Sequence, residues 1–116
     1  MGSLRTKESQ QKYKDLIAKG HLSIGCKLCE DKSLKEFTHW RIITNLFPFD
    51  LIAKTHHMII PKRHITYNEL TEVEKQELEL IKTTLLGEEY EFMIENLSKM
   101  KSIPEHFHLH LVVTKD

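Results

Sequence analysis

The sequence lacks any long hydrophobic run. No apolar stretch in its 116 residues approaches the roughly 20 residues that a membrane-spanning helix needs. The start of the chain also has no apolar core of the kind that a secretory signal peptide carries. We therefore expect a soluble, cytoplasmic protein without a membrane partner.

An excess of charge of one sign is also missing. Seventeen basic residues balance seventeen acidic residues, and no block of like charge stands out along the chain. A general nucleic-acid surface would need a basic excess, so we expect no extended nucleic-acid interface. A chain of 116 residues is long enough for one domain with a real core and too short for a second catalytic lobe.

Cysteine is scarce, and its spacing is informative. Cys26 and Cys29 are the only two cysteines, and they form a C-x-x-C pair. In a chain without a secretory signal, such a pair is more often half of a metal site or a redox pair than a structural disulfide. The β-α-β pattern that a redox pair favours is not evident, so zinc is favoured, and two more ligands must complete the site. His21 and His39 lie near the cysteines and are rival ligands.

Hydrophobic periodicity predicts an α+β domain with a short meander of strands. Thr71 can cap a helix, and Glu74 completes a capping box with it. Gly87 is expected to end that helix. The other expected elements are a helix over 6–18, strands over 37–45, 57–61 and 89–95, and a C-terminal strand.

Histidine stands at every second position near the end of the chain, at His106, His108 and His110. Because a strand has a side-chain period of two, the three imidazoles would face one side, and Phe107 and Leu109 the other. Neutral imidazole is both a metal ligand and a nucleophile near neutral pH. The row therefore indicates metal ligation or attack on an electrophile such as phosphorus; an exposed polar face is the simpler alternative.

Three segments carry motifs that are specific in combination. They are Asn-Leu-Phe-Pro-Phe-Asp at 45–50, Thr-His-His-Met-Ile-Ile-Pro-Lys-Arg-His at 55–64 and Pro-Glu-His-Phe-His-Leu-His at 104–110. Together they resemble the histidine triad (HIT) superfamily of nucleotide hydrolases and transferases. The resemblance implies a HIT-like antiparallel sheet with flanking helices, a nucleotide in a groove above the sheet, and a homodimer. We accordingly expect an N-terminal helical extension over 1–20 and a single HIT-like catalytic domain over 21–116.

The resemblance also implies catalytic roles. His108 would attack the α-phosphorus and form a nucleotidyl-histidine intermediate. His110 would contact a phosphoryl or leaving-group oxygen and orient His108, while His56 would support the hydrogen bonds of the triad. His57 would face away from His56, in a packing or surface role. A covalent intermediate lets water or another acceptor take the nucleotide in a second step, and no metal is required for this sequence of steps.

Zinc would then be structural. In the members of the superfamily that carry C-x-x-C, the remaining ligands resemble His64 and His106. The resemblance therefore implies a closed zinc site made of Cys26, Cys29, His64 and His106. The alternative places His106 in the nucleotide site, as in members without the cysteines.

The residues that would bind the ribose and base are implied by the first of these motifs, whereas those expected to reach phosphate lie outside the three segments. Two of these residues, Phe47 and Phe49, are aromatic, and either could instead belong to the core. The expected ribose and base contacts are Asn45, Phe47 and Phe49, and the expected phosphate contacts are Asn96 and Ser102.

One departure from the superfamily keeps a second function open. Many members carry glycines in the loop before the triad, where backbone N–H groups approach phosphate, but 95–105 contains none. The first hypothesis is a nucleotidyl hydrolase or transferase acting on dinucleoside polyphosphates or nucleoside phosphoramidates. The second is a catalytically weak nucleotide-binding or scaffold protein of the same fold. A catalytic metal centre formed by the histidines and cysteines is a third, less favoured interpretation.

Overall fold

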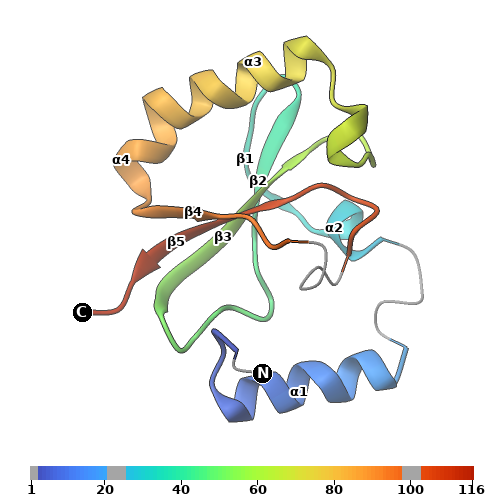
Figure 1. Cartoon of the computed structure of the whole chain (residues 1–116), viewed down its shortest axis with the longest axis vertical. Coiled ribbons are helices and arrows are strands. Elements are labelled where there is room, and N and C mark those ends of the chain that lie inside the picture. The colour runs from blue at the N-terminus through green and yellow to red at the C-terminus, as the bar shows by residue number, and fades with distance from the viewer. Residues whose placement is uncertain (1–2, 21–25, 98–102) are drawn as a thin grey trace.

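The computed structural model describes residues 3–20, 26–97 and 103–116, and these form an α+β fold (Figure 1). An antiparallel sheet has the strand order β1-β2-β3-β5-β4. Its strands are β1 (Ser33–Glu36), β2 (Trp40–Thr44), β3 (Ala53–Pro61), β4 (Phe92–Ile94) and β5 (Leu109–Thr114). The helical elements are α1 (Lys7–Ala18), α2 (Lys27–Glu30), η1 (Tyr67–Glu69), α3 (Glu72–Ile81), the π-helical turn η2 (Lys82–Leu86) and α4 (Gly87–Glu89). No helix in these described ranges is long and apolar enough to cross a lipid bilayer.

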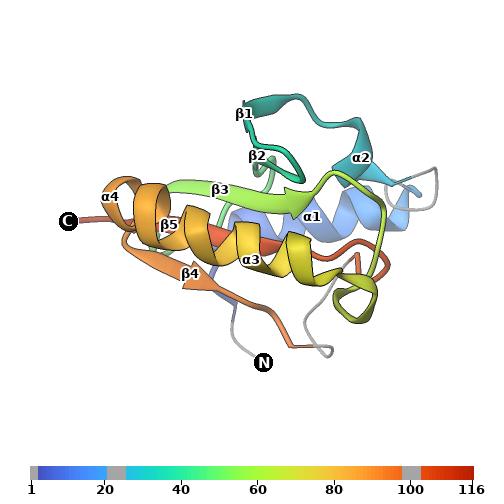
Figure 2. The same ribbon diagram turned by 90° about the horizontal axis from the view of Figure 1, so that it is seen from above.

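Different helices lie on the two sides of the sheet. Figures 1 and 2 show α3 and α4 along one face and α1 on the other side. Alternation along β5 directs Leu109 and Leu111 into the core on the α3 side, with Trp40 of β2 and Ile59 of β3. His110 stands between these two leucines in the strand, so its side chain lies on the opposite face of the sheet. The α3 side supplies the largest apolar core, and the other face is left for polar groups.

The helix that starts after Thr71 begins as predicted but ends differently. Thr71 and Glu74 form the capping box, and α3 begins at Glu72. The prediction that Gly87 ends the helix is wrong, because the helical backbone continues through η2 and α4 to Glu89. Gly87 has φ −65° and ψ −19°, a right-handed helical conformation, so it does not act as a left-handed stop.

The histidine row is only partly within a regular strand. β5 begins at Leu109, so His106 and His108 precede it in an irregular segment. The alternation still holds, because Phe107 donates its backbone N–H to the carbonyl of Ile65 over 2.7 Å and packs in the α3-side core. The three imidazoles are buried, which excludes the exposed polar face.

The N-terminal helix is attached to the loop before β3. Thr6 caps α1, and Asp50 accepts hydrogen bonds from the backbone N–H of Thr6 over 2.8 Å and from its hydroxyl over 3.2 Å. The hydroxyl of Ser9 donates to the same carboxylate and is the largest cause of the lowered pKa of Asp50. A carboxylate at the start of a helix also complements the helix dipole. Leu51 donates its backbone N–H to the carbonyl of Leu4 over 3.0 Å, so the two segments are joined at several points.

Removing the charge of Glu74 tests how much its carboxylate at the start of α3 contributes to the stability of the fold. Its buried carboxylate accepts from Arg63 over 2.7 Å and from the backbone N–H of Thr71 over 2.8 Å, and the Arg63 bond is the largest cause that lowers its pKa to about 2. We expect Glu74→Gln to reduce the free energy of unfolding by about 1–2 kcal/mol at neutral pH. Urea denaturation measures it, with the exposed Glu72→Gln as control.

The contribution of the Glu74 carboxylate to the free energy of unfolding decreases as the pH falls. A carboxylate with a depressed folded-state pKa stabilises the fold above its unfolded value of about 4.3, and that contribution is lost as the pH falls toward about 2. The difference between wild type and Glu74→Gln should therefore shrink below about pH 4. A difference that is absent at neutral pH, or unchanged at low pH, would contradict this account.

Candidate active site and metal centre

The sheet brings His56 of β3 and His110 of β5 into contact. Both side chains are buried, and Nε2 of His56 lies 2.8 Å from Nδ1 of His110. The backbone N–H of Phe49 donates to Nδ1 of His56 over 2.8 Å. That nitrogen therefore carries the lone pair of the neutral ring, and Nε2 carries the proton. His56 then donates to Nδ1 of His110, which places the proton of His110 on its own Nε2.

The hydrogen bonds from the backbone N–H of Phe49 through His56 to His110 are called the relay below, and the Nε2–H of His110 is its last donor. Nε2 is buried and, among the residues described, has no hydrogen-bond partner. Buried polar atoms in folded proteins are nearly always paired, so an exception at a pocket marks a position for a ligand acceptor. His110 lines the pocket described below.

His108 is oriented by the backbone. Its Nδ1 lies 3.0 Å from the carbonyl oxygen of His106, and a carbonyl can only accept, so Nδ1 carries the proton. Nε2 of His108 is therefore the nitrogen with the lone pair. The ring centroids of His108 and His110 lie 5.2 Å apart. The site thus combines a nucleophilic nitrogen with a neighbouring N–H donor.

Burial keeps the relay uncharged. Desolvation lowers the pKa of His56 to about 4, with Arg5 as the next cause. Desolvation, followed by the charge effects of His108 and His56, lowers the pKa of His110 to about 3. Both rings are therefore neutral at neutral pH, as the assigned tautomers require.

A pocket of about 590 Å³, counted with its open mouth, is lined by His108 and His110. Three of the expected nucleotide contacts also line it, namely Asn45, Phe47 and Asn96. The remaining wall includes apolar side chains, which are Leu28, Leu46, Met58 and Ile103. The pocket therefore offers an apolar surface next to ring nitrogens and side-chain amides, a combination suited to a small organic ligand with a polar group.

Phe49 is the one expected nucleotide contact among the described residues that lies outside the pocket lining. Its buried ring packs behind the relay, with ring centroids 4.4 Å from His56 and 4.8 Å from His110. Its role is therefore packing, and its backbone rather than its ring serves the site. Ser102 lies outside the described residues.

Sequence reasoning missed part of the pocket wall. Arg5 and Tyr13 of the N-terminal segment line it, as do Lys27 and Asp31 around α2. No motif marks Arg5, Tyr13 or Asp31, and Lys27 stands at a variable position of C-x-x-C. All four reach the pocket through the packing of segments that are distant in sequence from the histidines. His57, by contrast, lies where expected, on the α3 side with Nδ1 2.7 Å from the hydroxyl of Tyr90.

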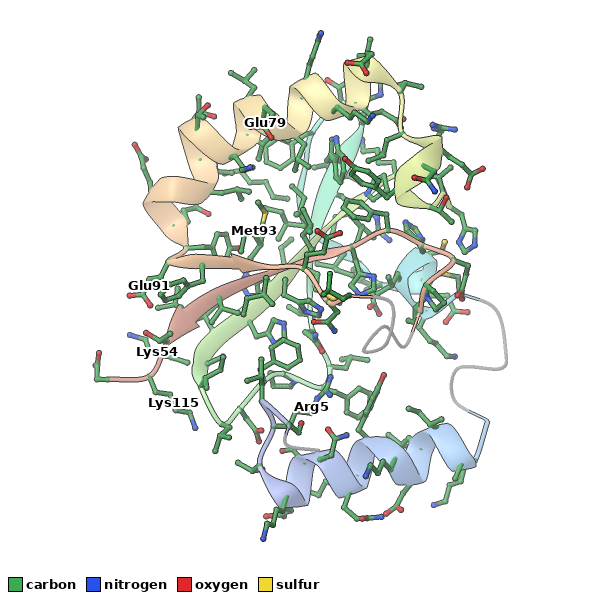
Figure 3. All side chains as sticks on the ribbon, in the orientation of Figure 1. Arg5, Lys54, Glu79, Glu91, Met93 and Lys115 are labelled. Carbon is green, nitrogen blue, oxygen red and sulfur yellow. The ribbon has the colours of Figure 1, made fainter. Side chains whose placement is uncertain are left out.

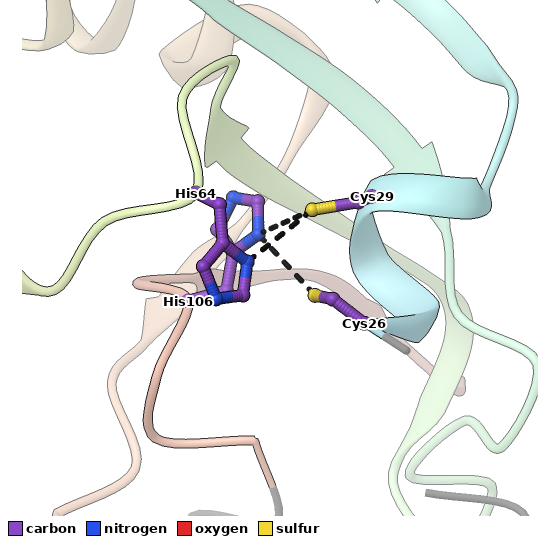
Figure 4. A group of neighbouring side chains, drawn as sticks. All are labelled: Cys26, Cys29, His64 and His106. Carbon is purple, nitrogen blue, oxygen red and sulfur yellow. Dashed lines mark hydrogen bonds between the residues drawn. The ribbon is translucent and has the colours of Figure 1, made fainter. Parts of the chain in front are cut away.

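A second cluster consists of Cys26, Cys29, His64 and His106 (Figure 4). Figure 4 shows them converging from α2, the turn after β3 and the segment before β5, and their ligand atoms all lie within 4.8 Å of one another. Sγ of Cys29 is 3.3 Å from Nδ1 of each histidine, and Sγ of Cys26 is 3.5 Å from Nδ1 of His106. The rival ligand His39 is not part of the cluster, and His21 lies outside the described residues.

The donor atoms of this cluster fit a tetrahedral metal ion. With metal–sulfur bonds of about 2.3 Å and metal–nitrogen bonds of about 2.0 Å, sulfur and nitrogen would lie about 3.6 Å apart. Nε2 of His106 donates to the carbonyl of Pro61 over 3.0 Å, which leaves the lone pair on Nδ1, toward the thiols. Burial and Cys26 raise the pKa of Cys29 to about 11, so a cation is what would turn this thiol into a ligand thiolate. These four residues could hold a metal ion.

Comparison with known proteins supports the fold. No protein-family model matches the chain, and no curated protein matches it in sequence. Among solved structures, a HIT family hydrolase from Legionella pneumophila is 22% identical with a TM-score of 0.55, covering 79% of this chain and 95% of that one. A HIT family hydrolase from Clostridium thermocellum is 22% identical with a TM-score of 0.54, covering 77% of this chain and 90% of that one. A histidine triad protein from Clostridium difficile is 15% identical with a TM-score of 0.57, covering 80% of this chain and 92% of that one. At these identities the likeness establishes the HIT-like fold alone.

The relay can be tested by NMR on the folded protein. Long-range ¹H–¹⁵N spectra should show Nε2–H for His56 and His110 and Nδ1–H for His108. Because the pKa values of His56 and His110 are lowered to about 4 and about 3, both rings should stay neutral from about pH 7 to about pH 5. The chain unfolded in urea is the control, since its histidines titrate near about 6.5.

The same pKa shifts make stability depend on pH. Unfolded histidines bind protons below about pH 6.5, while these folded ones do not until about 4 and about 3, so the free energy of unfolding falls as the pH drops through that window. Protonation of His110 near its unperturbed pKa, or an Nδ1–H tautomer of that ring, would be inconsistent with the relay.

Proposed function

We propose that the chain is a HIT-type nucleotidyl hydrolase or transferase. It cleaves at the α-phosphorus of dinucleoside polyphosphates or nucleoside phosphoramidates through a nucleotidyl-His108 intermediate. The observation that carries this proposal is the orientation of two rings at one pocket: His108 with its lone pair on Nε2, and His110 with its proton on Nε2. The fold shared with HIT family hydrolases adds support.

The proposed reaction has two displacements. Nε2 of His108 attacks the α-phosphorus and forms an N–P bond, and the leaving group departs with the electrons of its own bond to phosphorus. The Nδ1–H bond to the carbonyl of His106 stabilises the positive charge that develops on the ring. The Nε2–H of His110 donates to a phosphoryl oxygen as negative charge builds on it. Water, or another nucleophilic acceptor, then attacks phosphorus and loses a proton to the leaving group or to solvent. The N–P bond breaks, and its electron pair returns to Nε2 of His108.

Substrate contacts follow from the pocket. We propose Asn45, Phe47 and Asn96 as nucleotide contacts because all three line it. The carboxamide oxygen of Asn45 accepts from the backbone N–H of Phe47 over 2.7 Å, and this bond directs its Nδ2 toward His56. Nδ2 lies 3.3 Å from Nε2 of His56, a contact between two N–H groups and not a hydrogen bond in the assigned tautomer. The side chain is therefore held in one orientation, with its amide beside the relay. Ser102 stays a prediction.

We propose in addition that the second cluster holds a structural zinc ion. Two thiols and two imidazoles are the ligand set that zinc prefers in closed structural sites, and four protein ligands leave no position for a substrate. When bound, the ion would fix α2 to the segment before β5. His106 would then serve both sites, because its side chain faces the thiols while its carbonyl orients His108.

The location, oligomeric state and domain boundaries of the protein are also proposals. We propose a cytoplasmic homodimer with a helical extension over 1–20 and a catalytic domain over 21–116. The edge position of β4 and the exposed side chain of Phe92 are compatible with a partner along that strand.

The glycine-free segment 95–105 favours a second candidate, a nucleotide-binding or scaffold protein with little turnover. Such a protein would use the same pocket and would bind nucleotide with the histidines in place. The two candidates differ in the chemistry at His108 alone, so one substitution separates them.

We expect His108→Asn to lower kcat by about a thousandfold or more, because asparagine cannot form the covalent intermediate. Nucleotide binding should change little. The measurement is release of nucleoside monophosphate from diadenosine polyphosphate and adenosine phosphoramidate substrates. The matched control is His39→Asn, because His39 neither lines the pocket nor belongs to the metal cluster. If wild type and His108→Asn bind nucleotide but are equally inert, the binding-protein candidate replaces the enzyme.

Zinc binding is tested by changing one ligand and one rival. We expect His64→Asn to lose bound zinc and to lower the melting temperature by about 10 °C, because the metal links distant segments. His39→Asn should retain one zinc per chain. Metal content by mass spectrometry and thermal unfolding provide the readouts. A chelator that abolishes turnover without changing the melting temperature would instead indicate a catalytic metal.

A further inference from the structure

The N-terminal segment supplies part of the pocket wall. Arg5 and Tyr13 line the same pocket as His108 and His110. Tyr13 is buried and is the only α1 residue among those described whose side chain is buried, with its ring centroid 4.9 Å from that of Phe47. The segment is therefore packed against the pocket rather than appended to the surface.

Arg5 is held in place by the pocket wall itself. Its Nε donates to the carbonyl of Phe47 over 2.8 Å, and its guanidinium lies 4.4 Å from the ring centroid of Tyr13 and 5.2 Å from that of Phe49. Figure 3 shows Arg5 on the side of the N-terminal segment that faces the sheet. Stacking on aromatic rings together with a directed hydrogen bond orients the guanidinium, which a flexible surface arginine would not need.

The backbone on either side of Arg5 is anchored as well. Leu4 accepts a hydrogen bond from the backbone N–H of Leu51, and Thr6 donates two hydrogen bonds to Asp50. These contacts fix the chain directly before and after Arg5. A binding group whose position is set before the ligand arrives loses less entropy on binding.

Among the described residues, no carboxylate is hydrogen-bonded to the Arg5 guanidinium, and Asp50 acts on it through its charge alone. Nη1 of Arg5 donates to the amide oxygen of Gln10 over 3.3 Å, and within the described ranges Nη2 has no hydrogen-bond partner. The second cationic residue that lines the pocket, Lys27, pairs with Glu30 over 3.5 Å. Arg5 thus brings a positive charge and the Nη2 donor to the pocket that His108 and His110 also line. A planar guanidinium with such donors suits a phosphate group.

We infer that Arg5 is a specificity-determining residue that binds a phosphate group of the substrate. This inference rests on the proposed function and deepens it. Arg5 acts on binding and not on the covalent step, since His108 and His110 already supply the nucleophile and the oxygen-binding donor. The N-terminal segment is consequently a working part of the site, and selectivity for phosphorylated over unphosphorylated nucleosides depends on it.

The experiment compares Arg5→Gln and Arg5→Lys with wild type by calorimetric titration of adenosine monophosphate and of adenosine. Loss of a charged hydrogen bond should weaken monophosphate binding by about ten- to a hundredfold in Arg5→Gln, while adenosine binding is unchanged. Arg5→Lys keeps the charge without the planar fork, and its affinity should be intermediate. Lys12→Gln removes an equivalent charge from the exposed surface of α1 and is the matched control.

The outcomes separate this inference from the proposed function. In turnover assays Arg5→Gln should raise KM and leave kcat within about threefold of wild type. Equal monophosphate affinity in wild type and Arg5→Gln, with turnover retained, would overturn the inference alone. Equal weakening of adenosine and its monophosphate would also overturn it, because Arg5 would then contact the nucleoside. Wild-type protein that neither binds nor cleaves nucleotides would overturn both. A melting temperature of Arg5→Lys equal to wild type ensures that the comparison does not reflect loss of the fold.

Discussion

The hydrogen bond from Nδ1 of His108 to the carbonyl of His106 is the interaction on which the rest of the site depends. An imidazole offers two nitrogens, and a ring that rotates or changes tautomer cannot present a defined lone pair. The backbone amide of Phe49 applies the same constraint to His56, and the effect passes through His56 to His110. Main-chain groups thereby set the proton positions of three rings without any carboxylate nearby among the described partners.

The remainder of the fold keeps these rings in place. The apolar side of β5 anchors Leu109 and Leu111 in the core beneath α3, so that the histidine side can be polar without loosening the strand. Burial without charge compensation is what lowers the pKa of His110, and a neutral ring is what the relay needs. The metal cluster lies at the start of the same segment, so a bound ion would stabilise the backbone of His106, which orients His108.

Local signals in the sequence predicted the elements that depend on local chemistry. The Thr71 capping box and the alternation of histidine and apolar residues are such signals. The α+β class with an antiparallel sheet agrees with the expectation, whereas β1 was not predicted. The spacing of Cys26 and Cys29 marked half of the metal cluster, but its two histidines were identified only through the resemblance, because Cys29 and His106 lie 77 positions apart. Arg5 was not predicted, since its contact with Phe47 spans 42 positions and no motif encodes it.

The central claim is that Nε2 of His108 forms a covalent bond to phosphorus, and trapping that species tests it most directly. Wild-type protein mixed with an adenosine phosphoramidate and quenched rapidly at alkaline pH should gain the mass of one adenylyl group. Peptide mapping should place the group on His108, because a phosphorus–nitrogen bond at histidine survives in base. Turnover without any modified protein, or modification at another residue, would contradict the account and indicate direct attack by the acceptor.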